Sequence, residues 1–429
     1  MPDMKHPHAH LTLERALANI ARDNARLNAI LDLSANPAGD VRPDGELAGF
    51  PVAVKSNIAV QGLPFTAGIG AFRDRIASTD AAAVERLREA GAVIVGSANM
   101  EEAAIGAVTD NPHFGRTHNP RRFGFTPGGS SGGSATAIAA GFSRVALGTD
   151  TMGSCRIPAA YCGVVGFKPS VGRISARGVE PLSRRLDHVG ILAANVADIR
   201  AVADVLCRFD ASFAWSIDYP PLACAATLPL NQCRFGVLNE TAIAGLPANV
   251  AMPYLQAILR LRGLGAVTVA QPVDQSMLGA ARRAGLLWCE AELVISLATE
   301  YSRADGGLSP SLRAMIAFAE KKGAPDLARA NGILDSMVLF ERMLFENVDA
   351  ILWPTAPQTA FAFDTPIPSN QADFTCLANF TGAAALSLPL PVANGELPAG
   401  LQIMLPRGSD GQLLDMSAGI EQMLNTSSS

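Results

Sequence analysis

Charged and aromatic residues are scarce in this chain of 429 residues. Asp, Glu, Lys and Arg together make up 17% of it and aromatic residues 6%, whereas hydrophobic residues make up 49%. A disordered chain has the opposite balance, so this composition predicts a compact globular protein with a large core. The net charge is −5 and no basic run occurs. Nucleic acid is therefore not expected as a direct partner.

Other missing features bear on location and cofactors. No run of about 18 uninterrupted apolar residues occurs, so no segment is expected to span a membrane. The first ten residues, MPDMKHPHAH, lack the apolar core of a secretory signal. The seven cysteines are scattered singly without a C-x-x-C pair, which favours reduced thiols and no zinc site. The sequence thus predicts a cytoplasmic protein that uses neither a metal nor a dinucleotide cofactor.

Helix and strand patterns alternate along the chain. Helices are predicted within 11–33, where Leu13, Leu17, Ile20, Leu27 and Ile30 share one face, and over 80–90 and 134–141. Strands are predicted within 49–60 and over 92–96, 144–150, 163–169, 235–238, 266–270 and 350–353. Such alternation is typical of an α/β layer structure. Because no linker-like composition divides the chain, we expect one domain over 1–429, with a helical excursion around 270–345.

The stretch TPGGSSGGSA, residues 126–135, is almost entirely glycine and serine. A flexible linker would join separate domains, but this stretch leads directly into a predicted helix and a predicted buried strand. A phosphate-binding loop requires G-x-x-x-x-G-K-[ST], and no lysine follows Gly132 or Gly133. Both interpretations are therefore disfavoured.

A nucleophile elbow is the third interpretation, because G-x-S-x-G occurs twice within the stretch. That motif should follow an apolar strand, but the preceding RRFGFTP is basic and ends in proline. His188 is the only histidine after residue 118, and its neighbour Asp187 is poorly placed along the chain to orient it. The sequence thus offers no well-placed histidine and acid for a Ser-His-Asp triad, although such a triad stays an alternative.

A lysine can replace histidine as the base if burial lowers its pKa. Lys55 stands within the apolar run PVAVKSNIAV, where a charged side chain is unusual. It could equally lie at a strand end and reach solvent. These residues alone leave both interpretations open.

Several motifs together resemble the amidase signature family. They include GFPVAVKSNIAV, TPGGSSGGSATAIAAG, ALGTDTMGSCRIPAAYCGVVGFKPSVGRIS and DAILWPTAP, which follow the family's order between about residues 11 and 420. The resemblance implies a large mixed β-sheet with helices on both faces. It also implies an amidohydrolase that works through a Ser-cisSer-Lys triad and an acyl-enzyme.

The family's residue roles are carried over to matching positions. Ser154 resembles the nucleophile, Ser130 the bridging serine on a cis peptide bond, and Lys55 the base. The resemblance places the oxyanion donors at the backbone N–H groups of Thr151, Met152, Gly153 and Ser154. Ser131, Asp150 and Arg156 resemble supporting residues, for which a purely structural role is equally open.

Two positions depart from the family pattern. Ser56 follows the lysine where the family usually has aspartate, and Met152 stands where a glycine is common. Met152 can still donate its N–H, and its side chain is expected to shape the pocket. Cys155, beside Ser154, has no candidate base and is expected to be a packing residue.

These motifs do not identify the substrate. We expect specificity to reside in 170–190 and 270–380, where Arg303, Arg313 and Tyr301 are candidates for binding a carboxylate or are merely solvated surface. A small polar amide or urea-like compound is preferred as the substrate. The alternatives are a glutamine-dependent amidotransferase component that works with partner subunits, an esterase and a non-catalytic homologue. A homodimer is expected only from the resemblance.

Overall fold

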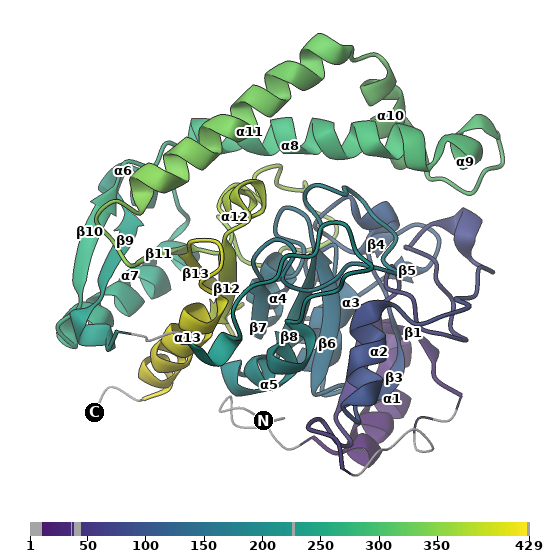
Figure 1. The fold of residues 1–429 in the computed structure, drawn as a ribbon, viewed down its shortest axis with the longest axis horizontal. Coiled ribbons are helices and arrows are strands. Elements are labelled where there is room, and N and C mark those ends of the chain that lie inside the picture. Colours follow the sequence, from purple (N-terminus) through teal and green to yellow (C-terminus); the bar gives the residue numbers. More distant parts are fainter. Residues whose placement is uncertain (1–10, 36, 38–43, 225–227, 427–429) are drawn as a thin grey trace.

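The computed structural model describes residues 11–35, 37, 44–224 and 228–426. Residues 1–10, for which no secretory signal is expected, lie outside the described residues. One 11-stranded sheet runs through the molecule in the order β1-β3-β2-β6-β8-β7-β12-β13-β11-β9-β10, and a two-stranded sheet joins β4 to β5 (Figure 1). Strands from both ends of the chain therefore share one sheet.

The strands are β1 (Ile30–Leu33), β2 (Pro51–Lys55), β3 (Val93–Ala98), β4 (Asp110–Asn111), β5 (Gly115–Arg116), β6 (Val145–Asp150), β7 (Val165–Lys168), β8 (His188–Ala193), β9 (Arg234–Leu238), β10 (Val267–Gln271), β11 (Ala350–Pro354), β12 (Ala384–Pro389) and β13 (Gly400–Leu405). The α-helices are α1 (Leu13–Leu27), α2 (Ala82–Glu89), α3 (Gly132–Ala139), α4 (Arg156–Cys162), α5 (Val196–Leu206), α6 (Glu240–Ala244), α7 (Ala248–Gly263), α8 (Gln275–Ser296), α9 (Ala298–Ser302), α10 (Pro310–Glu320), α11 (Ala324–Leu344), α12 (Cys376–Thr381) and α13 (Asp410–Asn425).

The large sheet is mixed. β2 pairs in parallel with β3 and β6, and β9 pairs in parallel with β10 and β11. The central strands β6, β8, β7, β12 and β13 pair in antiparallel fashion. This mixed sheet confirms the predicted α/β class.

Helices cover both faces of the sheet because successive strand residues point to opposite sides. In β2 and β6, Ala53 and Ala146 pack with residues of α1, α3 and α4. Their neighbours Val52, Val54 and Leu147 pack on the other side, in the core that includes α2 and α5. Every residue of both strands is buried, which explains why they read as continuous apolar runs.

The helical periodicity of 11–33 is misleading at its end. α1 stops at Leu27, and Ile30 begins β1 instead of continuing the helix. Asn28 adopts the left-handed conformation, and its N–H donates to the carbonyl of Asn24. The Asn24 side chain then accepts the N–H groups of residues 29 and 30 and so turns the chain into the sheet.

Three central strands, β8, β12 and β13, were not predicted. Each is a run of six residues, nearly all buried, and the turn pair Asn394-Gly395 lies within a longer connection, 390–399, between β12 and β13. Short apolar runs of this kind cannot be assigned from periodicity alone. β12, moreover, pairs with β7, which lies far away in the sequence.

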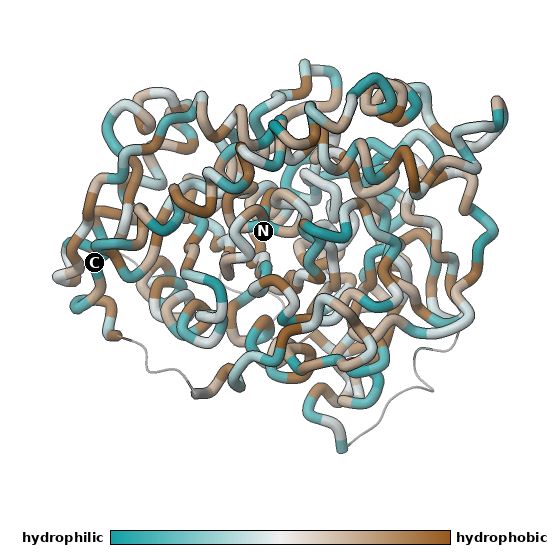
Figure 2. Tube along the Cα trace, turned by 45° about the horizontal axis from the view of Figure 1, so that its top comes forward, coloured by the Kyte–Doolittle hydropathy of each residue, from teal (hydrophilic) through white to brown (hydrophobic). Residues whose placement is uncertain are grey.

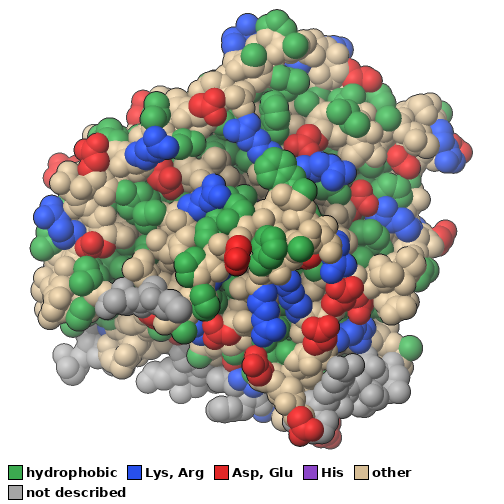
Figure 3. Space-filling model, viewed as in Figure 1, with side chains coloured by type: hydrophobic (Ala, Val, Ile, Leu, Met, Phe, Trp, Pro, Cys, Tyr) green, Lys and Arg blue, Asp and Glu red, His purple; other side chains and the backbone are tan. Residues whose placement is uncertain are grey.

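Helices α8 to α11 form a layer across one side of the core (Figure 1). α8 packs against α10, α11 and α12. Figure 2 shows hydrophilic and hydrophobic stretches alternating along these outer helices, as expected for helices with one buried side. On the face in Figure 3, acidic and basic side chains are interspersed among hydrophobic ones. Among the described residues, none of the helices combines the length and the hydropathy needed to cross a membrane.

Two glycine substitutions compare a tightly packed position in α3 with an open position in α11. A Cβ on Gly133 would lie 2.3 Å from the carbonyl oxygen of Asn99, so Gly133→Ala should destabilise the protein by about 1–3 kcal/mol or more. Gly332, inside α11, has open space around it, and Gly332→Ala should stabilise by about 0.5–1 kcal/mol. Denaturant unfolding of both variants measures this, and equal effects would contradict the packing at Gly133.

Candidate active site

Lys55 and Ser130 are brought together although 75 residues separate them. Lys55 ends β2, is fully buried, and its Nζ lies 2.7 Å from Ser130 Oγ. Nζ also lies 2.8 Å from Oγ1 of Thr149, at the end of the adjacent strand β6. The parallel pairing of β2 with β6 thus places the lysine amine beside Thr149, and the Gly/Ser stretch supplies the Ser130 hydroxyl.

The surroundings of Lys55 favour its neutral form. Burial lowers the pKa of Lys55 to about 8, although the carboxylates of Asp187, Asp150 and Glu101 partly offset this effect. No carboxylate within the described ranges forms an ion pair with the amine, which contacts only hydroxyl oxygens. Lys55 is therefore a buried amine that can lose its proton near neutral pH.

The Gly/Ser stretch forms the loop before α3. The peptide bond between Gly129 and Ser130 is cis, as the family resemblance implies. A Cβ on Gly129 would lie 2.8 Å from the backbone nitrogen of Val108, so the loop packs directly against the 106–109 segment. Thr109 joins the two segments, because its Oγ1 donates to the carbonyl of Gly128 and accepts the N–H of Gly132.

Ser154 lies in a tight turn between β6 and α4. Gly153 has φ +131°, and a Cβ there would lie 2.2 Å from Thr375 Oγ1, so only glycine fits this position. The Thr375 hydroxyl donates to the carbonyl of Met152 at 2.6 Å. The N–H of Ser131 donates to the carbonyl of Ser154 at 3.1 Å, which ties this turn to the Gly/Ser loop.

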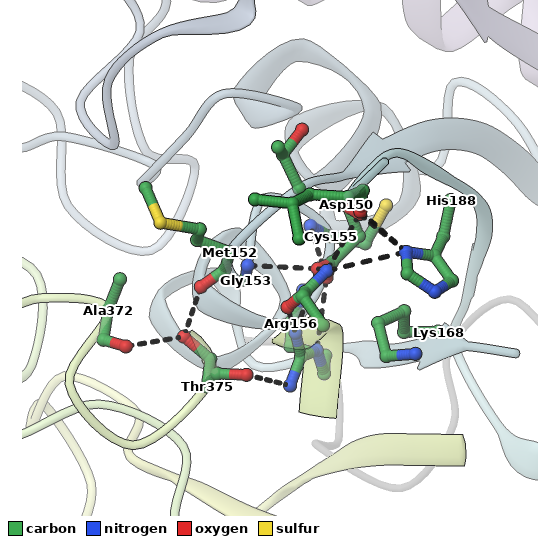
Figure 4. Close-up of polar contacts among 12 residues, drawn as sticks. Asp150, Met152, Gly153, Cys155, Arg156, Lys168, His188, Ala372 and Thr375 are labelled. Atoms are coloured by element: carbon green, nitrogen blue, oxygen red, sulfur yellow. Dashed lines mark hydrogen bonds and ion pairs between the residues drawn. The ribbon is translucent and has the colours of Figure 1, made fainter. Parts of the chain in front are cut away.

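Asp150 and Arg156 stabilise the turn that carries Ser154. The Arg156 guanidinium donates to both carboxylate oxygens of Asp150, at 3.0 and 2.8 Å, and neither side chain is exposed (Figure 4). The carboxylate also accepts the N–H groups of Gly153 and Cys155. Burial alone would raise the pKa of Asp150, but Arg156, the Asn379 amide and Lys168 lower it well below its usual range. The pair is therefore ionised throughout the working pH range.

A cavity of about 660 Å³ opens at Ser154. Thr151, Met152 and Ser154 lie on its wall, opposite residues from α8 and α10. Met152 reaches toward α8, since a Cβ on Gly285 would lie 3.0 Å from Met152 Sδ. The Met152 side chain thus helps to shape the pocket, as expected from the sequence. The N–H of Gly153, in contrast, is already bonded to Asp150.

His188 does not join this site. It is buried at the start of β8, and its Nδ1 lies 2.7 Å from the carbonyl oxygen of Leu186. Burial lowers the pKa of His188 to about 3, so the ring is neutral. Its neighbour Asp187 instead accepts the Thr151 hydroxyl at 2.6 Å and the N–H groups of residues 182 and 183. His188 lines a different cavity from Ser154, which removes support for a Ser-His-Asp triad.

Cys155 packs between strands. A Cβ on Gly148 or Gly190 would lie 2.7 or 2.6 Å from its Sγ, so the thiol fills the space above these two glycines. Burial raises the pKa of Cys155 to about 12. A buried thiol that stays protonated is a poor nucleophile, in agreement with a packing role.

The carboxylate-binding candidates lie outside the cavity of Ser154. Arg313 donates to the carbonyls of Tyr301, Glu300 and Arg303 at the end of α9, and its guanidinium lies over the Tyr301 ring. Arg303 pairs with Asp305 at an exposed position. Arg313 of α10 thus supports the end of α9, which favours the alternative of surface residues, while substrate binding by Arg303, Arg313 or Tyr301 stays a prediction.

Other residues of the cavity were missed by sequence reasoning. The wall includes Glu101 and Glu102 from the loop after β3, and Arg282 from α8. Specificity was expected in 170–190 and 270–380, which contribute Leu182, Arg282, Leu286, 309–312, Met315, 367–369, Gln371 and Ala372. The acidic pair in NMEEAA follows a predicted strand, which could have suggested a site at the sheet edge.

Removal of the Asp150 charge should destabilise the protein strongly. Asp150→Asn leaves the buried Arg156 without its counter-charge, and we expect a loss of about 3–5 kcal/mol in the free energy of unfolding. Asp23→Asn, which breaks the exposed pair with Arg22, should have no measurable effect. Thermal and denaturant unfolding measure both variants. A small loss for Asp150→Asn would contradict the organising role of this ion pair.

Comparison with known proteins agrees with this geometry. The Amidase family model matches residues 13–414. The A subunit of the glutamyl-tRNA(Gln) amidotransferase from Thermus thermophilus is 36% identical over 426 residues, covering 92% of this chain and 90% of its own length. Among solved structures, 6-aminohexanoate cyclic dimer hydrolase complexed with substrate has a TM-score of 0.85 at 26% identity and covers 96% of this chain and 93% of its own.

A second solved structure is similar to the same extent. It is a chain described in connection with a vestigial protein complex and the evolutionary origins of an s-triazine catabolic enzyme. Its TM-score is 0.87 at 28% identity, and the match covers 97% of this chain and 95% of that one. The chain therefore belongs to the amidase signature family, whose members act on carbon–nitrogen bonds.

Proposed function

We propose that this protein is an amidohydrolase that cleaves a carboxamide through a serine acyl-enzyme, with Ser154 as nucleophile, Ser130 as proton relay and Lys55 as base. The observation that carries the proposal is the 2.7 Å contact between the buried Lys55 amine and the Ser130 hydroxyl. A free lysine is protonated at neutral pH and cannot act as a base, whereas a desolvated lysine can. The six cysteines with described side chains are free thiols, which supports a reducing, cytoplasmic location.

In the proposed reaction a proton passes between these three groups. Neutral Lys55 takes a proton from Ser130, which takes the proton of Ser154 as its oxygen attacks the amide carbon. The leaving amine receives a proton by the same route, and water then hydrolyses the resulting ester. Ser131 helps to position the two serines, since its N–H donates to the carbonyl of Ser154 and its hydroxyl donates to that of Thr149.

The tetrahedral intermediate needs hydrogen-bond donors that are already oriented. The turn at Ser154 supplies backbone N–H groups, and within the described ranges those of Met152 and Ser154 donate no hydrogen bond. Since the N–H of Gly153 donates to Asp150, we propose Thr151, Met152 and Ser154 as the donors. Asp150, held by Arg156, would then orient the turn and not the substrate.

The cavity suggests a larger substrate than the sequence did. About 660 Å³ exceeds what a urea-like compound fills, and much of the wall is apolar, with Ile105, Ile157, Leu286 and Met315 among its residues. The expected preference for a small polar amide therefore finds no support in the pocket. We propose an amide with an apolar group.

A component of a glutamine-dependent amidotransferase is the second candidate. Relatives at 32 to 36% identity are glutamyl-tRNA(Gln) amidotransferase A subunits. Such a protein would release ammonia from glutamine and transfer it with partner subunits. Glutamine hydrolysis that rises on addition of co-purified subunits would favour this candidate over an independent amidohydrolase.

Ammonia release from a panel of aliphatic amides, ureides and glutamine tests the proposed residues. Ser154→Ala, Ser130→Ala and Lys55→Ala should each lower the rate by about 10³-fold or more, because each removes a member of one catalytic unit. Cys155→Ala is the matched control, since its thiol is buried and protonated, and it should stay active. Activity that survives Ser154→Ala would refute the mechanism.

The pH dependence tests the base separately. Lys55 is active only when neutral, so kcat/KM should rise about tenfold per pH unit below the lysine pKa, near 8, and level off above it. The measurement is a kcat/KM profile with a slowly hydrolysed amide, so that chemistry limits the rate. A flat profile between about pH 6 and 9 would argue against a lysine base.

A further inference from the structure

The wall of the cavity at Ser154 carries more acidic than basic side chains. Four ionisable side chains lie on its wall: Glu101, Glu102, Asp110 and Arg282. Three of them already have partners in the protein: Glu102 is hydrogen-bonded to His113 at 2.9 Å and accepts the N–H of Ser309 at 2.9 Å, and the ion pairs Asp110–Arg116 and Arg282–Asp373 measure 2.9 and 2.7 Å. A charged ligand would have to compete with these partners for each of the three groups.

Glu101 is the exception. Its Oε2 accepts the N–H groups of Val108 at 3.0 Å and Thr109 at 2.5 Å, but within the described ranges no cationic side chain forms an ion pair with it. Burial raises the pKa of Glu101, which reflects the unfavourable environment of its charge. An unpaired carboxylate on a largely apolar wall gains free energy from a bound cation.

Glu101 also lies close to the proposed catalytic residues. Its N–H donates to the carbonyl of Ser130 at 3.1 Å. The residues that its carboxylate holds, Val108 and Thr109, pack against the Gly/Ser loop. A group bound by Glu101 would therefore belong to the same ligand whose amide reaches Ser154.

We propose that Glu101 binds an ammonium group of the substrate, so that the preferred substrate is an amide with a protonated amine on an apolar body. The inference rests on the proposed function, because it names the substrate class of the same cavity. A carboxylate-bearing substrate is disfavoured, since Arg282 is the only cationic group on the described wall and Asp373 already neutralises it. The apolar residues that face Glu101's cavity, such as Leu286 and Met315, suit the alkyl or aryl part of the ligand.

Matched ligands can separate the ammonium from the rest of the molecule. Each ω-amino alkanamide of a series is compared with the neutral amide in which a methyl group replaces the ammonium, at about pH 8, where the amine is charged. Binding is measured by calorimetry on the Ser154→Ala protein, and kcat/KM on the wild type. We expect the amine to be preferred by about tenfold or more at the best chain length, which corresponds to about 1.4 kcal/mol.

Glu101→Gln tests whether this carboxylate is the cause. The amide oxygen can still accept the Val108 and Thr109 N–H groups, while the charge is lost. We expect the preference for the amine to fall to about one, through weaker binding and higher KM of the amine only. Asp110→Asn is the matched control, because that carboxylate lines the same cavity but is paired with Arg116. It should keep the preference.

The outcomes distinguish this inference from the proposed function. Equal losses for both ligands in Glu101→Gln would show that Glu101 only holds the 106–109 segment and would overturn the inference. So would equal binding of both ligands to the Glu101-containing protein at every chain length. Hydrolysis that survives Ser154→Ala, or no hydrolysis of any amide, would instead count against the proposed function, because the calorimetric comparison does not depend on turnover.

Discussion

The buried ion pair between Arg156 and Asp150 organises the site. Arg156 also donates to the Thr375 carbonyl, Asn379 Oδ1 and Gln402 Oε1, so one guanidinium joins the end of β6, the first turn of α4, α12 and β13. In return, Asp150 accepts N–H groups of the turn that carries Ser154. A fully buried charge must keep its partner, and this requirement holds the turn in one shape.

Two lysines illustrate how partners decide chemistry. Lys55 and Lys168 are both buried at the ends of strands, and burial lowers the pKa of Lys168 to about 7. Lys168 donates to the carbonyls of Pro169 and Ala383, which have no proton to exchange. Lys55 faces the hydroxyl of Ser130, through which a proton can pass. The low pKa is common to both, and only the contact with a hydroxyl makes one of them a candidate base.

The layer of helices α8 to α11 forms part of the cavity wall at Ser154. α8 and α10 contribute wall residues opposite the Ser154 turn, and Gly285 leaves room for the Met152 side chain beneath α8. Met152, an unusual residue in this turn, thus packs against a helix that lies outside the triad and its sheet. In the proposed function, the catalytic groups would come from the sheet and its loops, and the helices of this layer would contribute to the choice of substrate.

The sequence by itself determined the α/β class, most strands, and the positions of Lys55, Ser130 and Ser154, because local periodicity and the order of motifs can be recognised without the fold. The triad roles remain a prediction. Only the tertiary structure decided that Ile30 enters the sheet, that Arg313 binds backbone carbonyls and that Glu101 forms no ion pair among the described residues. Each of these depends on partners brought close by folding, and the pairing of a charge is a property of that neighbourhood and not of the residue itself.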